Sequence, residues 1–487
     1  MSLSSLQNKI SEAFTKKFSE KSSETVVKNA EKTVEAGIGD ATKVIGEKTS
    51  QKLTTETIKL SKDALSKGKL SSLMNVSFVE DAVVKEVVSK TGDLTSKDAV
   101  KMIEQANKKY AEKTPELVAL KYRSMSDSPF AFDRATDYLF VSNVQGSKQL
   151  QTKVKIPIAQ DIHLENFGTY KTGEGKVAFG INDFDEAVVA PYTWDLARVG
   201  SSIRLAAKQN GLSEKEGKEL VEIFAKDYVD GLKKFQEKTD KVSEPLTKSK
   251  TFGKHVEKTI KTSEEASQKD FVKELTKDGK FIFNDKIRPI SPEVKKEIEA
   301  GIKAYAKGRP EGADFFKIKD SAFIIAGKGS LGRERYVVLL EGAGKGKKEQ
   351  VVLELKEAVQ PNSINALGKQ TGNQAQRVID ATKNFQPSSD PFLGVTRMNG
   401  KDFFVREVSP SNNKVPIEKL NTFSEFKDYV ESVALVVSKA HATSGKTNEI
   451  ISDVGSKKEL AEKIGDFSQS YLDKVQDYFK EFKKANK

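Results

Sequence analysis

The chain of 487 residues contains no cysteine, which excludes disulfide bonds, thiolate catalysis and cysteine-ligated zinc. Histidine is almost as scarce, because the sequence has only His163, His255 and His441. A metal site built from several histidines is therefore not expected. A magnesium site remains open, since Mg²⁺ is bound by carboxylate and other oxygen ligands.

Long apolar runs are also missing. No stretch approaches the ~18 consecutive apolar residues that span a bilayer, and the N-terminus lacks the apolar core of a signal peptide. We therefore expect a cytoplasmic protein without a transmembrane segment. Signal-independent export is compatible with the lack of cysteine, but nothing in the sequence supports it.

The formal net charge is +12, and a basic balance can indicate an acidic partner such as nucleic acid. The lysines, however, are mostly interleaved with glutamate and aspartate, a pattern typical of solvated helix faces. Nucleic acid is therefore not an expected partner. Apolar residues make up 37% of the chain, which is enough for a hydrophobic core.

Composition divides the chain into five segments. Residues 1–115 are rich in Lys, Ser and Glu, and their apolar spacing predicts a helical extension. Such helices can bind a protein partner, or they can form an extension without chemistry. The other segments are a catalytic-loop segment at 116–235, a helical insertion or connector at 236–315, a strand-rich nucleotide-binding segment at 316–415 and a helical segment at 416–487.

Two acidic motifs flank a predicted β-hairpin in the second segment. Asp161 and Asn166 stand five residues apart in the run DIHLEN, and Asp183 and Asp185 follow the hairpin in NDFDEA. Phosphoryl transfer needs an aspartate near the attacking hydroxyl, and an asparagine and a second aspartate that hold Mg²⁺. We assign the first role to Asp161 and the metal to Asn166 and Asp183, with Asp185 as a helper. The alternative is that these residues only cap turns.

A glycine-rich turn lies between two predicted strands of the fourth segment, where Gly327, Gly329, Ser330 and Gly332 belong to the run GKGSLG. A dinucleotide-binding turn would instead join a strand to a helix. Backbone without a Cβ can approach phosphates closely, and Lys356 at the end of a later strand could reach them as well. The alternative is a glycine-rich hairpin beside a solvated lysine.

The order of these motifs is reversed relative to protein kinases, in which the glycine-rich loop and the lysine precede the catalytic loop. A helix predicted at 373–384 and another at 422–443, which ends near His441, would complete the kinase order if the chain were read circularly. We therefore expect an α+β, protein-kinase-like, two-lobed fold that is circularly permuted and carries a helical N-terminal extension.

The chain contains eight notable motifs: SPFAFDRATDYLF, DIHLENFG, NDFDEA, PYTWDLARVGSS, GKGSLGRERYVVLLEG, LELKEA, FFVREVSP and AHATSG. Together they resemble a mainly bacterial family known as domain of unknown function 2252. The loop also resembles that of aminoglycoside-phosphotransferase-like kinases, which reads Asp-x-His-x-x-Asn. That resemblance implies ATP and Mg²⁺ as cofactors. This chain departs from the family at Gln160, where glycine is usual, and its helix at 373–384 offers only Asp380 as a partner for Lys356.

The leading hypothesis is an ATP- and Mg²⁺-dependent phosphotransferase that acts on a small molecule or a protein. The first alternative is a nucleotidyl transferase that uses the same pocket. The second is an inactive, nucleotide-binding pseudokinase that binds a partner through its N-terminal helices. We expect His163 to orient the catalytic loop, His441 to be a packing or capping residue, and Asp195 to be the N-cap of a helix.

Overall fold

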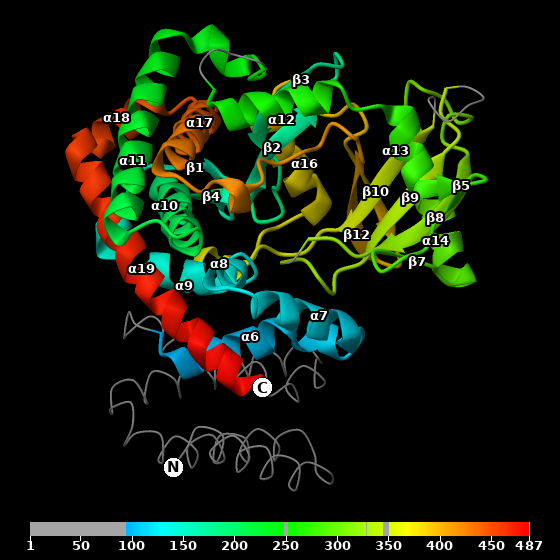
Figure 1. Cartoon of the computed structure of the whole chain (residues 1–487). Helices are drawn as coiled ribbons and strands as arrows, with labels where there is room; N and C mark the ends of the chain where they lie inside the picture. Colours follow the sequence, from blue (N-terminus) through cyan, green and yellow to red (C-terminus); the bar gives the residue numbers. More distant parts are fainter. Residues whose placement is uncertain (1–93, 248–251, 328, 344–349, 487) are drawn as a thin grey trace, which may run out of the picture. The chain divides into compact units, whose positions relative to one another are not determined.

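The structure is a computed structural model that describes residues 94–247, 252–327, 329–343 and 350–486. Most of the predicted N-terminal extension lies outside these residues. The part of the chain from Asp93 to Lys487 forms one compact unit. It combines many helices with a few short hairpins and one larger sheet, so the expected α+β class is confirmed (Figure 1).

The larger sheet has six antiparallel strands formed mainly by the strand-rich segment. In spatial order they are β11 (Gly394–Met398), β12 (Lys401–Glu407), β10 (Val351–Glu357), β9 (Arg335–Leu340), β8 (Ile318–Ile324) and β7 (Ile287–Arg288). The first five arise from the runs of β-branched and aromatic residues in the sequence. The short strand β7 was not predicted, because two residues carry too little periodicity to be recognised.

Side chains of the sheet alternate between two apolar layers, as the pleat of a strand requires. On β9, Tyr336 and Val338 belong to a cluster with Ile298 and Ile302 of helix α14 (Pro292–Tyr305). Val337 of the same strand joins a second cluster with residues of helix α13 (Gln268–Leu275). Both faces of the sheet are therefore covered, and helix α16 (Gln374–Phe385) packs against β11 and β12.

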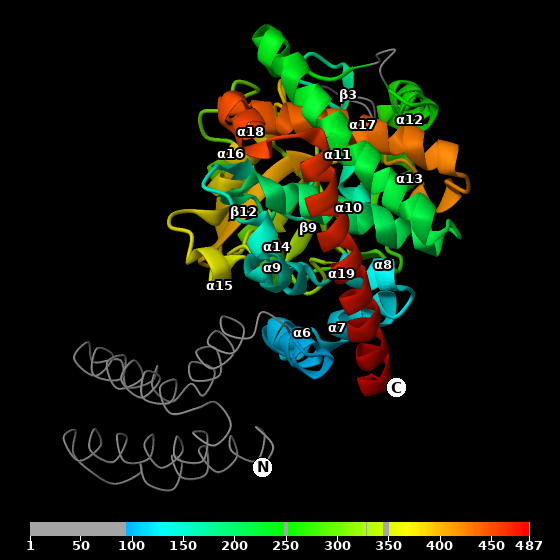
Figure 2. The same cartoon turned by 90° about the vertical axis from the view of Figure 1, so that its left-hand side faces the viewer.

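Four long helices form the centre of the helical region. They are α10 (Tyr192–Gln209), α11 (Glu214–Glu237), α17 (Phe423–Ala442) and α19 (Lys457–Ala485). Helix α11 packs against α17 and α19, and both views of the ribbon show these helices side by side (Figures 1 and 2). Three of the four begin with a capping box, in which a Ser or Thr N-cap and a Glu three residues later satisfy free N–H groups.

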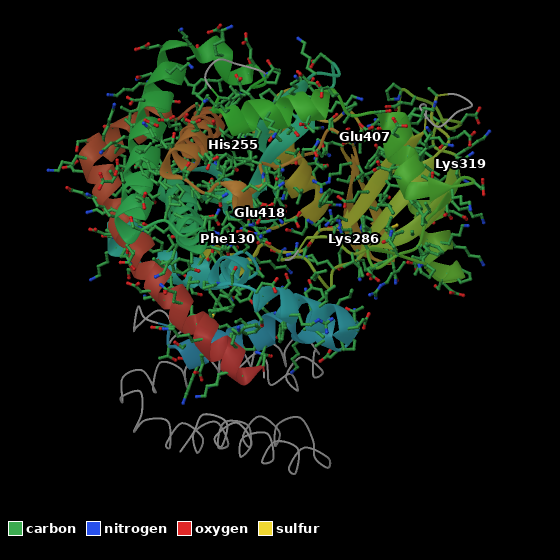
Figure 3. All side chains as sticks on the ribbon, in the orientation of Figure 1. Phe130, His255, Lys286, Lys319, Glu407 and Glu418 are labelled. Carbon is green, nitrogen blue, oxygen red and sulfur yellow. The ribbon has the colours of Figure 1, made fainter. Side chains whose placement is uncertain are left out.

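Shorter elements surround this centre. The helices are α6 (Ser96–Ala111), α7 (Pro115–Met125), α8 (Pro129–Asp133), α9 (Asp137–Gly146), α12 (Lys254–Glu264), α15 (Ile364–Leu367) and α18 (Thr447–Val454). Three hairpin-like pairs join β1 (Lys155–Ile158) to β4 (Val188–Pro191), β2 (Phe167–Lys171) to β3 (Val177–Ile181) and β5 (Thr276–Lys277) to β6 (Lys280–Phe281). In Figure 3, Phe130 and His255 lie in the helical region, whereas Lys286 and Lys319 lie in the sheet region.

The predicted hairpin after Asn166 is present as β2 and β3, and the helix predicted at 373–384 is α16. Asp195 is not an N-cap, because α10 begins three residues earlier, at Tyr192, and Pro191 occupies the cap position. Among the described helices, none is long and apolar enough to cross a bilayer.

Candidate functional site

The loop from Asp161 to Asn166 connects β1 to the β2–β3 hairpin. The Nδ2 atom of Asn166 donates a hydrogen bond to the backbone carbonyl of Asp161, at 2.6 Å. The carbonyl of Asn166 accepts from the N–H of Asn182 at 3.0 Å, which brings Asp183 to the same end of the hairpin. Because Nδ2 is used within the loop, Oδ1 of Asn166 remains as a ligand for a cation.

Asp195 of α10 holds the two residues that precede this loop. Its two carboxylate oxygens accept hydrogen bonds from the backbone N–H of Ala159 at 3.1 Å and of Gln160 at 2.8 Å. Nε2 of His441 lies 3.2 Å from Asp195, and Nδ1 lies 2.8 Å from the hydroxyl of Tyr228. Both ring nitrogens of His441 are thus within hydrogen-bond distance of a buried partner. His441 is thus buried in a hydrogen-bonded support for the loop.

Gln160 adopts a φ of 66°, a left-handed conformation that is uncommon for residues other than glycine. Its side chain donates from Nε2 to Asp137 at 2.8 Å. The backbone contact with Asp195 and this side-chain contact together hold the strained residue. The left-handed turn at Gln160 is thus fixed by one backbone and one side-chain hydrogen bond.

Arg198 links the carboxylates of Asp133 and Asp161. It lies on α10, is completely buried, and donates from Nη1 to Asp133 at 2.7 Å. Its Nε and Nη2 atoms both donate to Oδ1 of Asp161, at 3.0 and 2.9 Å. Burial raises the pKa of Asp161 well above its ordinary value, although Arg198 opposes this shift. No described residue donates a hydrogen bond to Oδ2 of Asp161, which is thus available to a hydroxyl.

His163 is buried within the loop, and its Nδ1 atom has no hydrogen-bond partner among the described residues. Burial lowers its pKa well below the ordinary value, and the charges of Arg134 and Arg198 lower it further. The imidazole is therefore neutral at neutral pH. The next acidic residue, Glu165, forms an ion pair with Arg134.

The two aspartates of the NDFDEA segment lie in different surroundings. Asp183 remains partly exposed, whereas Phe184 is buried and stacks on Phe385 of α16, with ring centroids 5.7 Å apart. Asp185 lies 2.6 Å from Nζ of Lys356 and 3.0 Å from Nη1 of Arg333. Burial alone would raise the pKa of Asp185, but these two cations lower it to about 2.

Lys356 therefore obtains its counter-charge from Asp185, a partner that the sequence left open. The lysine is buried on β10. The acidic candidate on α16, Asp380, instead accepts a hydrogen bond from Gln376. The residue of α16 that reaches the site is Arg377. It donates hydrogen bonds to the backbone carbonyls of Asp185 and Ala187, both at 2.8 Å.

The glycine-rich loop is held close to helices α6 and α7. Gly332 has a φ of 99°, and a Cβ atom there would lie 2.7 Å from the ring of Tyr110. Nζ of Lys121 donates to the carbonyl of Gly329 at 3.0 Å. Arg333, which follows the loop, also pairs with Glu186 at 3.2 Å, and burial raises the pKa of Glu186 to about 7.

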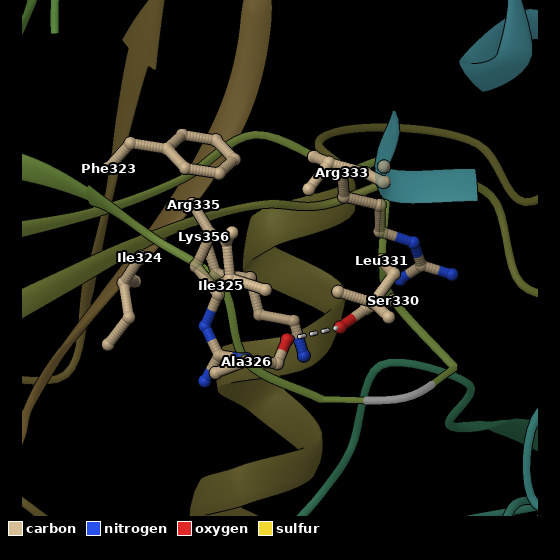
Figure 4. A pocket seen from close by; sticks show the side chains of 11 residues that line it. Phe323, Ile324, Ile325, Ala326, Ser330, Leu331, Arg333, Arg335 and Lys356 are labelled. Atoms are coloured by element: carbon tan, nitrogen blue, oxygen red, sulfur yellow. Dashed lines mark hydrogen bonds between the residues drawn. The ribbon is translucent and has the colours of Figure 1, made fainter. Parts of the chain in front are cut away.

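A pocket lies against this loop and is lined by Ser330, Arg333, Arg335 and Lys356 among others (Figure 4). Its empty volume is about 240 Å³ with the solvent at its mouth included.

The structure brings together two groups of predicted residues. Asp161, His163, Asn166 and Asp183 share one end of the β2–β3 hairpin. Lys356 and Asp185 contact each other directly, and the glycine-rich loop reaches Asp185 through Arg333. Among the residues that the structure describes, no three Asp, Glu or His side chains converge on a common cation position.

Sequence reasoning missed the arginines of the site. Arg198 was detectable, because it lies three residues after Asp195 and hence on the same face of the helix. Arg333 and Arg377 gave no such signal, since charged residues near loops and on amphipathic helices are usually solvated.

The family described as "Uncharacterized protein conserved in bacteria", DUF2252, matches residues 112–485. No curated protein and no solved structure matches the chain. The family match covers both the Asp161 loop and the glycine-rich loop, together with all the strands of the larger sheet. With well over half of its 487 residues matched, the chain belongs to the bacterial family DUF2252.

Proposed function

We propose that this protein is an ATP- and Mg²⁺-dependent phosphotransferase with a kinase-like, circularly permuted arrangement. The observation that carries the proposal is the 2.6 Å contact between Lys356 of the sheet and Asp185, in the segment that also contains Asp183. These residues are far apart in the sequence, yet the contact joins the strand lysine to the acidic hairpin segment, as a phosphate-binding cleft requires.

The oxygen ligands fit a magnesium ion. Asn166 would offer Oδ1, because its Nδ2 is committed to the loop, and Asp183 would offer its partly exposed carboxylate. Bound Mg²⁺ would neutralise charge on the phosphates of ATP. Asp185 is committed to Lys356 and Arg333, so we assign it to holding these cations in place and not to the metal.

Asp161 would orient the acceptor through its free Oδ2 atom. The acceptor hydroxyl donates its proton toward Oδ2 while its oxygen attacks the γ-phosphorus of ATP. The bond from that phosphorus to the β–γ bridging oxygen breaks, and ADP leaves with the electron pair. The raised pKa of Asp161 makes its carboxylate a stronger proton acceptor than an ordinary aspartate. His163 is neutral, which favours a role in orienting the loop.

Asp183→Ala supplies the test of metal-dependent nucleotide binding. We expect ATP with Mg²⁺ to raise the melting temperature of the wild type, since a ligand at 100 times its Kd stabilises by about 2.7 kcal/mol. The variant should lose this shift, because Asp183 is the carboxylate assigned to the metal. Asp380→Ala is the matched control, since Asp380 contacts Gln376 on α16 and has no assigned role.

Unchanged stabilisation of Asp183→Ala by ATP and Mg²⁺ would contradict the metal assignment. The mass of a product from incubation with ATP and a cell extract separates phosphoryl from nucleotidyl transfer, because the acceptor gains either phosphate or AMP. An inactive nucleotide-binding protein is the second candidate. Asp185 is paired with Lys356 and Arg333 and so does not assist the metal, which favours this candidate. It predicts stabilisation by ATP without any product.

A further inference from the structure

Lys121 is a buried lysine that lacks an acidic partner. It lies on α7, and only 4% of its surface is exposed. Its Nζ atom donates to the carbonyl of Gly329 at 3.0 Å, and no carboxylate of the described residues lies within ion-pair distance of it. A buried ammonium group is costly unless a counter-charge compensates it. The position therefore calls for an anion that the described residues do not provide.

The two neighbouring cations of the loop are already paired. Arg333 pairs with Asp185 and Glu186, and Lys356 pairs with Asp185. Burial and the charge of Arg333 together lower the pKa of Lys121 to about 7, against the weaker opposing effect of Glu186. Of these three cations beside the glycine-rich loop, Lys121 is thus the one without a counter-charge among the described residues.

The backbone of the glycine-rich loop lies close to Lys121. Gly329 and Gly332 have no side chains, and Tyr110 fills the space beneath Gly332. Leu117 of the same helix as Lys121 packs with Leu331 of the loop. The ammonium group is therefore held at the loop backbone by packing on both sides, and a phosphate oxygen in place of the carbonyl of Gly329 would meet it at hydrogen-bond distance.

We propose that Lys121 is a phosphate ligand, which α7 supplies to the glycine-rich loop, for the polyphosphate chain of a nucleoside triphosphate. The proposal rests on the proposed function for the identity of the nucleotide, but the anion site itself can be tested without adenine. Lys121 exchanges its bond to the carbonyl of Gly329 for charge-assisted hydrogen bonds to phosphate oxygens, which are stronger.

The test measures the affinity of the full-length chain for inorganic tripolyphosphate and for ATP with Mg²⁺, by isothermal titration calorimetry. Lys121→Met removes the charge and keeps an unbranched side chain. We expect both affinities to fall about tenfold or more, the loss for one hydrogen bond between charged groups. Lys113→Met is the matched control, because Lys113 is exposed nearby and the variant loses the same charge. Its affinities should stay within about twofold of the wild type.

Circular dichroism and melting curves of each variant verify the fold, and Lys121→Gln replaces Lys121→Met if the latter is misfolded. Unchanged tripolyphosphate affinity in the Lys121 variant would overturn the inference and leave the phosphotransferase proposal standing. Lys121-dependent binding of tripolyphosphate without binding of ATP would support the anion site and overturn the phosphotransferase. If neither probe binds the wild type, both proposals are wrong.

Discussion

Two arginines, Arg198 and Arg333, each pair with two carboxylates. Arg198 neutralises Asp133 and Asp161, and Arg333 neutralises Asp185 and Glu186. Breaking a buried pair by removing one partner typically destabilises by about 3–5 kcal/mol, because the other charge stays buried. Variants of these arginines thus affect folding together with activity, and they are poor tools for isolating a catalytic role.

Lys121 gives a pH-dependent stability that can be measured. Its pKa is about 7 in the folded protein, whereas the ordinary pKa of a lysine, as in the unfolded chain, is 10.5. Between these values the unfolded chain binds a proton that the folded chain releases, so stability rises as the pH increases from 7 to 9. We expect the wild type to gain up to about 1.4 kcal/mol per pH unit relative to Lys121→Met.

Urea denaturation of both proteins at pH 7 and pH 9 provides this comparison, and the difference between the two proteins removes the contributions of all other groups. A difference that is constant with pH would show that Lys121 stays protonated in the folded state. Lys113→Met again serves as the control, since the side chain of Lys113 is exposed.

The contact between α11 and α17 depends on a glycine. A Cβ atom on Gly231 of α11 would lie 2.1 Å from Oγ of Ser438 on α17, and the two helices pack along much of their length. Gly217 lies on the same helix, but a Cβ there would meet Ala207 at 3.9 Å, an ordinary contact. The helix thus contains one glycine that packing requires and one that it does not.

We expect Gly231→Ala to destabilise the protein by about 1–3 kcal/mol, because overpacking forces side chains or backbone to shift. Gly217→Ala should instead stabilise it by about 0.5–1 kcal/mol, since alanine favours the helix more than glycine does. Both changes are measurable by chemical denaturation. Equal effects of the two substitutions would show that helix propensity, and not the interhelical contact, governs this region.

The elements that the sequence predicts best are those with a strong local signal. The β2–β3 hairpin follows from two short runs around a glycine turn, and α16 follows from its apolar spacing. The sequence also placed Asp161, Asn166 and Asp183 in two motifs that flank this hairpin. It could not predict that Asp185 would pair with Lys356, or that β7 would join the sheet, because both depend on contacts between distant segments.

At the scale of the whole described unit, the two ends of the chain lie close enough to be joined by a linker. New ends can then be opened elsewhere without changing the fold. Helix α19 packs against α6, and the hydroxyl of Tyr478 donates to the carbonyl of Leu94 at 3.1 Å. Ala485 lies seven residues further along the same helix, about 10 Å at 1.5 Å per residue. A Gly/Ser linker of about ten residues spans roughly 16–19 Å, which is enough to join these ends.

A permuted chain can therefore run from Ala313 through Asn486 and this linker to Leu94, and end at Gly312. The new ends lie in an exposed loop, and the glycine-rich loop then precedes Asp161, as in kinases. We expect cooperative unfolding within about 5 °C of the unpermuted chain 94–487, because loop closure changes the free energy only slightly. An aggregated or noncooperative permutant, beside a folded unpermuted control, would contradict this expectation.

The position of Trp194 has a practical consequence. It is the sole tryptophan in the sequence, its ring is buried, and it lies in the first turn of α10, directly before Asp195. Tryptophan fluorescence of the intact protein therefore originates from a single place, the helix turn that supports the Asp161 loop. A spectral change on adding ATP and Mg²⁺ would report movement there. Coincidence of the emission and circular dichroism transitions during denaturation would show that this turn unfolds together with the rest of the chain.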